Sequence, residues 1–189
     1  MTTKAVAVVL ILGIPSGACL SACSSPQPGT LSGSDLPSAM GLQETASTTP
    51  DRGTRRLVDA LRSPSIGCEN SRLALFTPGG RPFHAFSNST VTGYVQIVSS
   101  ASACGSDANA RKGLDEVAKA KGATQSLSGI GREARSISFA TSHTHMEIVF
   151  WQVGQFNGIV IIQGPRNDSW ITAGLAERLA RRAANSASS

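Results

Sequence analysis

The chain has 189 residues, a formal net charge of +5 and only nine aromatic side chains. Its basic residues are scattered, apart from Arg55 with Arg56 and a group near the C-terminal end. Nucleic-acid-binding domains gather basic side chains on one face and use aromatic ones to stack bases, so this composition argues against a nucleic-acid partner. The length suits a single domain.

The first 22 residues have the layout of a secretory signal peptide. A basic head ends at Lys4, an apolar run covers 5–14, and Pro15 and Gly17 precede the cysteines. This pattern is typical of exported chains. The apolar run has about half of the ~20 residues that a helix needs to cross a bilayer, so a permanent transmembrane anchor is the weaker interpretation.

Residues 20–23, Leu-Ser-Ala-Cys, resemble the bacterial lipobox. In proteins with this motif a diacylglyceryl group is attached to the cysteine thiol before the signal peptide is removed. The resemblance implies that Cys23 carries acyl chains such as palmitate and holds the mature protein at the cell membrane, on the extracytoplasmic side. The alternative is ordinary cleavage after Ala22, which leaves Cys23 as an N-terminal thiol.

Residues 23–50 form a segment rich in Ser, Thr and Pro. Its few bulky apolar residues, such as Leu31 and Leu36, bury too little surface to offset the entropy of ordering the chain. We therefore expect a lipidated, disordered tether here, followed by one folded domain over 51–185.

The N-terminal half of this domain is predicted to contain a helix and three strands. Asp51 is a suitable N-cap for a helix that Pro64 ends. Apolar runs typical of strands follow over 71–77, 82–87 and 90–99.

Two cysteines, Cys68 and Cys104, remain in the predicted mature domain. Because export places them in an oxidising compartment, we expect a disulfide between them, with two buried free thiols as the alternative. The chain has no Cys-x-x-Cys pair, which argues against a thioredoxin-type redox site and a zinc knuckle.

The C-terminal half carries the clearest periodicity. Helices are predicted over 106–121 and 168–184, and strands over 134–141, 144–153 and 156–163. Gly154 and Gln155 form a two-residue connection that favours a tight antiparallel hairpin between the last two strands. The whole order of elements predicts an α+β fold, an antiparallel sheet of about six strands with helices packed mainly on one face.

Two patterns that resemble cofactor sites are better explained as turns. Residues 129–134 match the GxGxxA dinucleotide fingerprint, but a strand pattern follows where the fingerprint requires a helix. His143 and His145, with Glu147, have the spacing to approach a metal ion, yet zinc usually takes three or four ligands and His143 falls in a turn. We therefore expect no cofactor and no metal site. The sequence has no Gly-x-Ser-x-Gly elbow, and it predicts no catalytic residues.

The aromatic residues Phe150, Trp151, Phe156 and Trp170 group around the predicted hairpin and the start of the last helix. If helices cover one sheet face only, these rings are candidates for binding an apolar ligand on the other face. Packing in the hydrophobic core is the alternative.

Residues 127–184 are similar to the C-terminal part of small actinobacterial, mycobacterial-type cell-envelope lipoproteins. The similarity lies in Gly-Ile-Gly-Arg-Glu-Ala at 129–134, the hairpin sequence from Glu147 and the Ala/Arg-rich helix from Leu175. Arg132 stands where that family has an acidic residue. The resemblance implies a sensor-like α+β domain that is not an enzyme and binds an apolar small molecule or an envelope protein. An envelope-modifying hydrolase is the alternative function.

Overall fold

The computed structural model describes residues 29–45, 55, 59, 68–80, 93–123 and 125–187. The predicted signal peptide, Cys23 and the strand predicted over 82–87 lie outside these residues. Arg55 and Asp59 are helical, in agreement with the helix predicted after Asp51, and the rest of that helix is also outside the described part.

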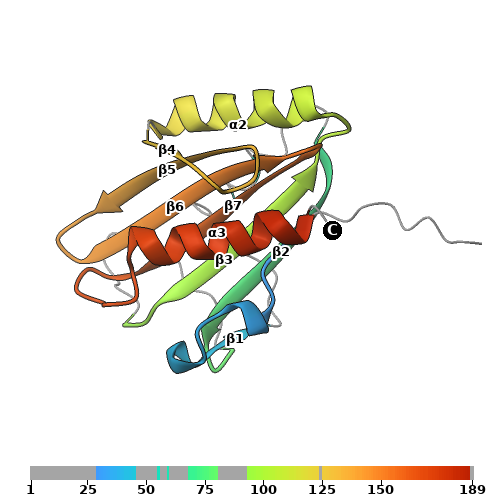
Figure 1. The fold of residues 1–189 in the computed structure, drawn as a ribbon. Helices are drawn as coiled ribbons and strands as arrows, with labels where there is room; N and C mark the ends of the chain where they lie inside the picture. Colours follow the sequence, from blue (N-terminus) through green and yellow to red (C-terminus); the bar gives the residue numbers. More distant parts are fainter. Residues whose placement is uncertain are drawn as a thin grey trace, which may run out of the picture.

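One antiparallel sheet of seven strands forms the centre of the described chain (Figure 1). The strands lie in the order β1-β2-β3-β7-β6-β5-β4. Their bounds are β1 (Leu42–Glu44), β2 (Glu69–Pro78), β3 (Gln96–Ala103), β4 (Gln125–Leu127), β5 (Glu133–Ala140), β6 (Thr144–Val153) and β7 (Phe156–Pro165). The predicted α+β class with an antiparallel sheet is confirmed, with seven strands in place of about six.

The hairpin of β6 and β7 is the best-predicted part of the sheet. Gly154 has φ of 51°, a left-handed conformation that glycine adopts without strain, and the two strands pair from Val153 opposite Phe156 onward. β7 then pairs with β3 on its other side, so it lies in the interior of the sheet. The predicted two-residue connection and antiparallel pairing are therefore confirmed.

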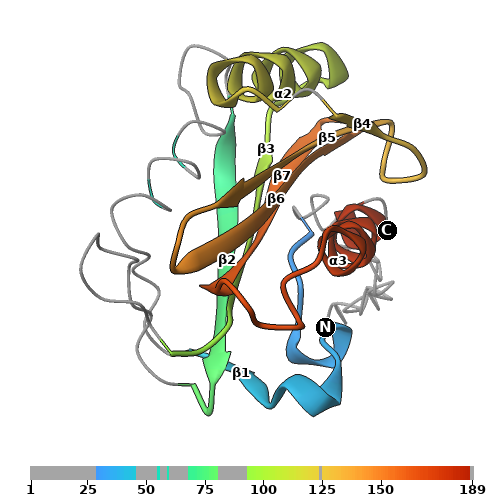
Figure 2. The ribbon, with the colours of Figure 1, turned by 90° about the vertical axis from the view of Figure 1, so that its left-hand side faces the viewer.

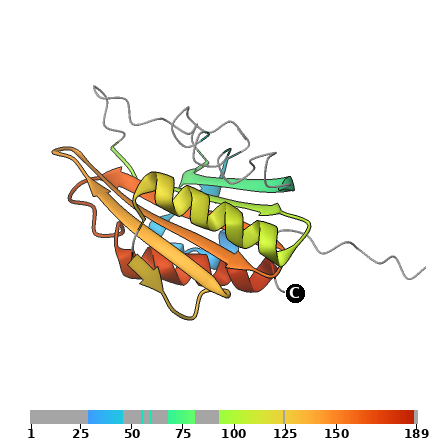
Figure 3. The same cartoon turned by 90° about the horizontal axis from the view of Figure 1, so that it is seen from above.

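The two long helices of the described part cover opposite faces of the sheet (Figure 2). They are α2 (Asp107–Lys121) and α3 (Ala173–Ala187). Leu114 of α2 packs in one apolar cluster with Phe150, and Leu179 of α3 packs in another with Trp151, although Phe150 and Trp151 are neighbours in β6. Seen from above, α2 lies over the strands and α3 beneath them (Figure 3). The prediction of helices mainly on one face is wrong, because successive side chains of a strand point to opposite faces and β6 is apolar on both.

The helix ends differ in how well they follow the sequence signals. Ser106 caps α2 by accepting a hydrogen bond from Asn109 N, and Gly122 ends it with φ of 71°, so the helix agrees closely with the one predicted over 106–121. The last helix begins at Ala173 and not near Asp168, because residues 166–172 form a turn whose Thr172 Oγ1 accepts a hydrogen bond from Leu175 N.

One strand is displaced from its predicted position. The apolar alternation over 90–99 predicted a strand there, whereas β3 begins at Gln96 and continues through a Ser- and Ala-rich stretch to Ala103. Hydrogen bonding to β2 on one side and β7 on the other holds these small residues in the strand despite their weak β-propensity.

Residues 29–45 are ordered against the domain, so the prediction of a disordered tether is wrong for this part of 23–50. The segment forms η1 (Gly33–Asp35), η2 (Ser38–Met40) and the edge strand β1, and it runs beside α3 (Figure 2). Leu31 and Leu36 are buried in the same apolar cluster as α3. Residues 29–45 therefore belong to the packed part of the described chain, although they precede the domain boundary predicted at residue 51.

Candidate functional site

The four aromatic side chains proposed as a ligand site do not form one surface. Phe150 is fully buried on the α2 side of the sheet, whereas Trp151 and Phe156 are buried on the α3 side. Trp170 is partly buried and packs against the α3-side cluster. The predicted binding surface is wrong, and the alternative, that these rings belong to the core, describes the structure.

Three polar side chains meet on the α3 side of the hairpin formed by β5 and β6. Ser138 Oγ lies 2.9 Å from Glu147 Oε1 and 3.2 Å from His145 Nε2, and His145 Nε2 lies 2.9 Å from the same carboxylate oxygen. Only 8% of the Glu147 side chain is exposed, and these two neighbours supply hydrogen-bond partners for its carboxylate.

This cluster lacks the geometry of a serine-hydrolase relay. In such a relay the imidazole takes the serine proton on one nitrogen and is oriented by the acid through the other. Here Ser138 and Glu147 both contact Nε2 of His145. Among the described residues, no three His, Cys, Asp or Glu side chains are arranged to hold a metal ion, and His143 is exposed in the turn.

The GxGxxA match forms a turn into the sheet, as predicted. Gly129 and Gly131 have φ of 70° and 56°, and β5 begins at Glu133 where a dinucleotide fold would begin a helix. A Cβ at Gly131 would overlap the backbone carbonyl of Gln152, so the glycine is explained by close packing on β6.

A half-open cleft of about 280 Å³ lies between α3 and the N-terminal segment. Its walls come from η1 and the residues after it on one side and from two turns of α3 on the other. The lining residues are Ser34, Asp35, Leu36, Pro37, Leu175, Arg178, Leu179 and Arg182. The cleft thus combines four apolar side chains with two guanidinium groups.

The positive charge of this cleft is not neutralised by the carboxylate in its wall. Both Ser32 N and Ser32 Oγ donate to Asp35 Oδ2 at 2.8 Å, which turns the carboxylate toward the start of η1. Arg182 donates to the backbone carbonyl of Asp35 instead. Neither Arg178 nor Arg182 forms an ion pair within the described part of the chain, so the cleft favours an anion.

The wall formed by the N-terminal segment is fastened to the domain at several points. Leu31 N donates to Ser99 Oγ of β3 at 3.1 Å, in the interior of the protein. Gly29 packs so closely on the last turns of α3 that a Cβ there would overlap Ala187 N and Ser186 Oγ. These contacts fix η1 relative to α3 and therefore fix the width of the cleft.

This cleft could not be predicted from the sequence because its two walls lie about 140 residues apart in the chain. A signal was present in Leu31 and Leu36, two bulky apolar residues in an otherwise polar segment. Bulky apolar residues of this kind need a partner surface, and α3 supplies it.

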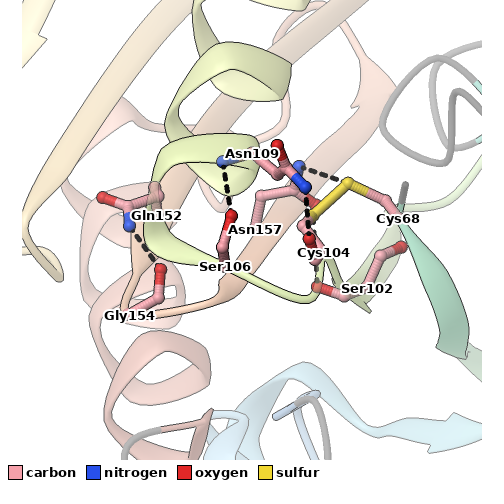
Figure 4. The surroundings of a disulfide bond; sticks show 8 residues. All are labelled: Cys68, Ser102, Cys104, Ser106, Asn109, Gln152, Gly154 and Asn157. Carbon is pink, nitrogen blue, oxygen red and sulfur yellow. Dashed lines mark hydrogen bonds between the residues drawn. A yellow bond between two sulfur atoms is a disulfide. The ribbon is translucent and has the colours of Figure 1, made fainter. Parts of the chain in front are cut away.

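The predicted disulfide between Cys68 and Cys104 is present (Figure 4). It joins the residue before β2 to the residue after β3, next to the N-terminus of α2. Asn109 Nδ2 donates to Cys104 O at 3.1 Å, and Asn157 Nδ2 approaches Cys68 Sγ at 3.7 Å. This end of the sheet is closely packed, with both cysteines buried beside Ala110.

Comparisons with known proteins identify no relative. No family model matches the chain, and no curated protein or solved structure matches it significantly. None of the described helices is long and apolar enough to cross a bilayer.

Proposed function

We propose that the protein is a lipoprotein anchored through Cys23 on the extracytoplasmic side of the cell membrane, and that it is a non-catalytic module that binds a small amphiphilic anion in the α3 cleft. The anchor is supported by the sequence Leu-Ser-Ala-Cys at 20–23. The binding role is supported by one observation above all: two guanidinium groups without a carboxylate partner in the described chain stand over an apolar wall.

The size and chemistry of the cleft suggest the class of ligand. Its volume of about 280 Å³ is near the lower limit of the ~300–1,000 Å³ usual for small-molecule sites. A phosphate or carboxylate would accept hydrogen bonds from Arg178 and Arg182, and a short alkyl part would contact Leu175 and Leu179. The predicted apolar ligand on an open sheet face is replaced by this site, since the two helices cover both faces.

The anchor predicts a loss of membrane association when the thiol is removed. In a bacterial host fed an alkyne-bearing palmitate, the full chain should incorporate the label and sediment with membranes. Cys23→Ser should abolish the label, and also the sedimentation once the membranes are washed with salt, because it removes the thiol that would carry the acyl chains and salt releases proteins held by charge alone. Cys19→Ser is the matched control, since Ser16 stands where a lipobox ending at Cys19 would need an apolar residue, and it should retain the label. An unlabelled wild-type chain would contradict the anchor.

The cleft predicts that the mature chain binds hexyl phosphate more tightly than hexanol. Calorimetry measures the two affinities, and NMR shifts of residues 34–37 show whether the ligand lies in the cleft. A hydrogen bond to a charged group contributes roughly 1.5–3 kcal/mol, so Arg178→Gln should weaken binding on the order of tenfold to a hundredfold. Arg181→Gln removes the same charge from the same helix but outside the cleft, and it should change the affinity little.

Two results would argue against this site. One is equal weakening by Arg178→Gln and Arg181→Gln, which would indicate a general effect of charge. The other is a set of NMR shifts centred on Ser138, His145 and Glu147, which would place the ligand at that cluster.

A further inference from the structure

The distance between the proposed anchor and the folded domain is short. Gly29 is in contact with the last turns of α3, and Cys23 precedes it by six residues. An extended chain spans at most about 3.6 Å per residue, so Cys23 and Gly29 are separated by no more than about 22 Å. If Cys23 is acylated, as proposed above, the C-terminal end of α3 is held within that distance of the bilayer.

The exposed side of α3 near this end carries a concentrated positive charge. Arg178, Arg181 and Arg182 are all exposed, and their spacing of three and four residues places them on one side of the helix. Glu177 is the one acidic residue of α3, and none of the three arginines forms an ion pair with a described residue. A free charge of this kind within a short reach of a membrane is attracted to anionic headgroups.

The opposite side of the domain has a different charge pattern. The sheet separates α2 from α3 (Figure 2), so α2 faces away from any surface that α3 contacts. α2 carries four basic and three acidic residues, and several of them form ion pairs, such as Lys112 with Glu116 and Arg111 with Asp107. The positive and negative charges of α2 therefore largely cancel within the helix.

We propose that the arginine face of α3, formed by Arg178, Arg181 and Arg182, lies on anionic phospholipid headgroups. The short connection from Cys23 brings this face to the bilayer, and the unpaired guanidinium groups complement the phosphates. The domain is then held flat against the membrane with α2 toward the extracytoplasmic space. This orientation rests on the proposed anchor at Cys23.

Vesicle binding by a chain that lacks the acyl anchor tests the arginine face of α3 directly. The mature chain with Cys23→Ser is sedimented with vesicles of phosphatidylcholine alone or with 3:1 phosphatidylcholine and phosphatidylglycerol. We expect binding only to the anionic vesicles, and we expect it to weaken as salt is added. Arg178→Gln with Arg181→Gln and Arg182→Gln should lower the partition coefficient on the order of tenfold or more.

The matched control removes the same charge from the other side of the domain. Lys112→Gln with Lys119→Gln and Lys121→Gln takes three exposed positive charges from α2 and should change vesicle binding less than about twofold, since a face turned away from the bilayer contributes little. Because Arg182 also contacts Asp35, the pair Arg178→Gln and Arg181→Gln serves as a second variant that leaves this contact intact. Thermal unfolding of each variant checks that the fold is retained.

The possible outcomes test the proposed orientation, the proposed anchor and the proposed cleft site separately. Equal loss of binding in the α2 and α3 triple variants, or equal binding to neutral and anionic vesicles, would overturn the proposed face. A chain that is not acylated in the host would refute the anchor, while the vesicle result would still report on α3. Arg181→Gln should weaken vesicle binding but not hexyl phosphate binding, which distinguishes the membrane face from the cleft.

Discussion

Replacing both Cys68 and Cys104 by alanine is expected to lower the free energy of unfolding by about 4 kcal/mol in the chain-entropy description of a cross-link. The bond joins residues that are 36 apart in sequence, so it reduces the conformational entropy of the unfolded chain by closing a long loop. Domains of this size hold about 5–15 kcal/mol in total, so the variant should have lost a large part of its stability. Urea unfolding of the mature chain, with and without the substitutions, measures the difference.

Reduction of the unsubstituted protein provides the control for this experiment. A thiol reductant should produce the same loss of stability in the wild-type chain and no further loss in the double variant. The intact mass should be two hydrogens below that of the reduced chain. A difference in stability below about 1 kcal/mol would contradict the prediction, because the chain-entropy description requires several times that value.

Trp151→Ala is the second substitution for which we expect a large effect, a loss of about 3–5 kcal/mol. The indole is fully buried, and it lies opposite Gly158 of β7, where a Cβ would overlap the ring. Alanine would therefore leave a cavity between the sheet and α3 that the surrounding side chains cannot close. Chemical unfolding monitored by far-ultraviolet circular dichroism measures the change without depending on tryptophan fluorescence.

Phe139→Ala is the matched control for this substitution. Phe139 is also an aromatic residue of the sheet, but 55% of it is exposed, so its removal should cost less than about 0.5 kcal/mol. If Trp151→Ala were as mild as Phe139→Ala and instead weakened hexyl phosphate binding, the indole would belong to a ligand site and not to the core.

The strands and turns that local signals specify could be predicted from the sequence. Gly154 and Gln155 between two apolar runs identify a hairpin, and Ser106 and Gly122 delimit α2, because these residues act on their immediate neighbours. The disulfide could be predicted from the cysteine count together with the predicted export signal.

The arrangement of the helices could not be predicted from local patterns. The apolar side chains on both faces of β6 were interpreted as one covered and one open face, whereas α2 packs on Phe150 and α3 on Trp151. Periodicity shows that both faces of a strand are apolar, but it does not show which helix crosses which face. The predictions of an aromatic binding site and of helices mainly on one sheet face are wrong for this same reason.

The cleft is formed by contacts between residues that lie far apart in the sequence. Residues 29–45 have the composition of a disordered segment, and their order comes from Leu31, Leu36 and β1 packing on elements far along the chain. The sequence pattern shows Arg178 and Arg182 only as part of a basic helix end. Their role in the cleft depends on where Asp35 directs its carboxylate, which is determined only when the chain is folded.

The contact of Gly29 with the end of α3 also sets an order of events in the making of the protein. Chains are synthesised from the N-terminus, and the partners of Gly29 are Ala183, Ser186 and Ala187, among the last residues to be made. Until then Gly29 lacks the α3 surface on which it packs, although Leu31 can already donate its hydrogen bond to Ser99 of β3 and β1 can already pair with β2. Docking of Gly29 therefore has to wait for the last helix to be completed.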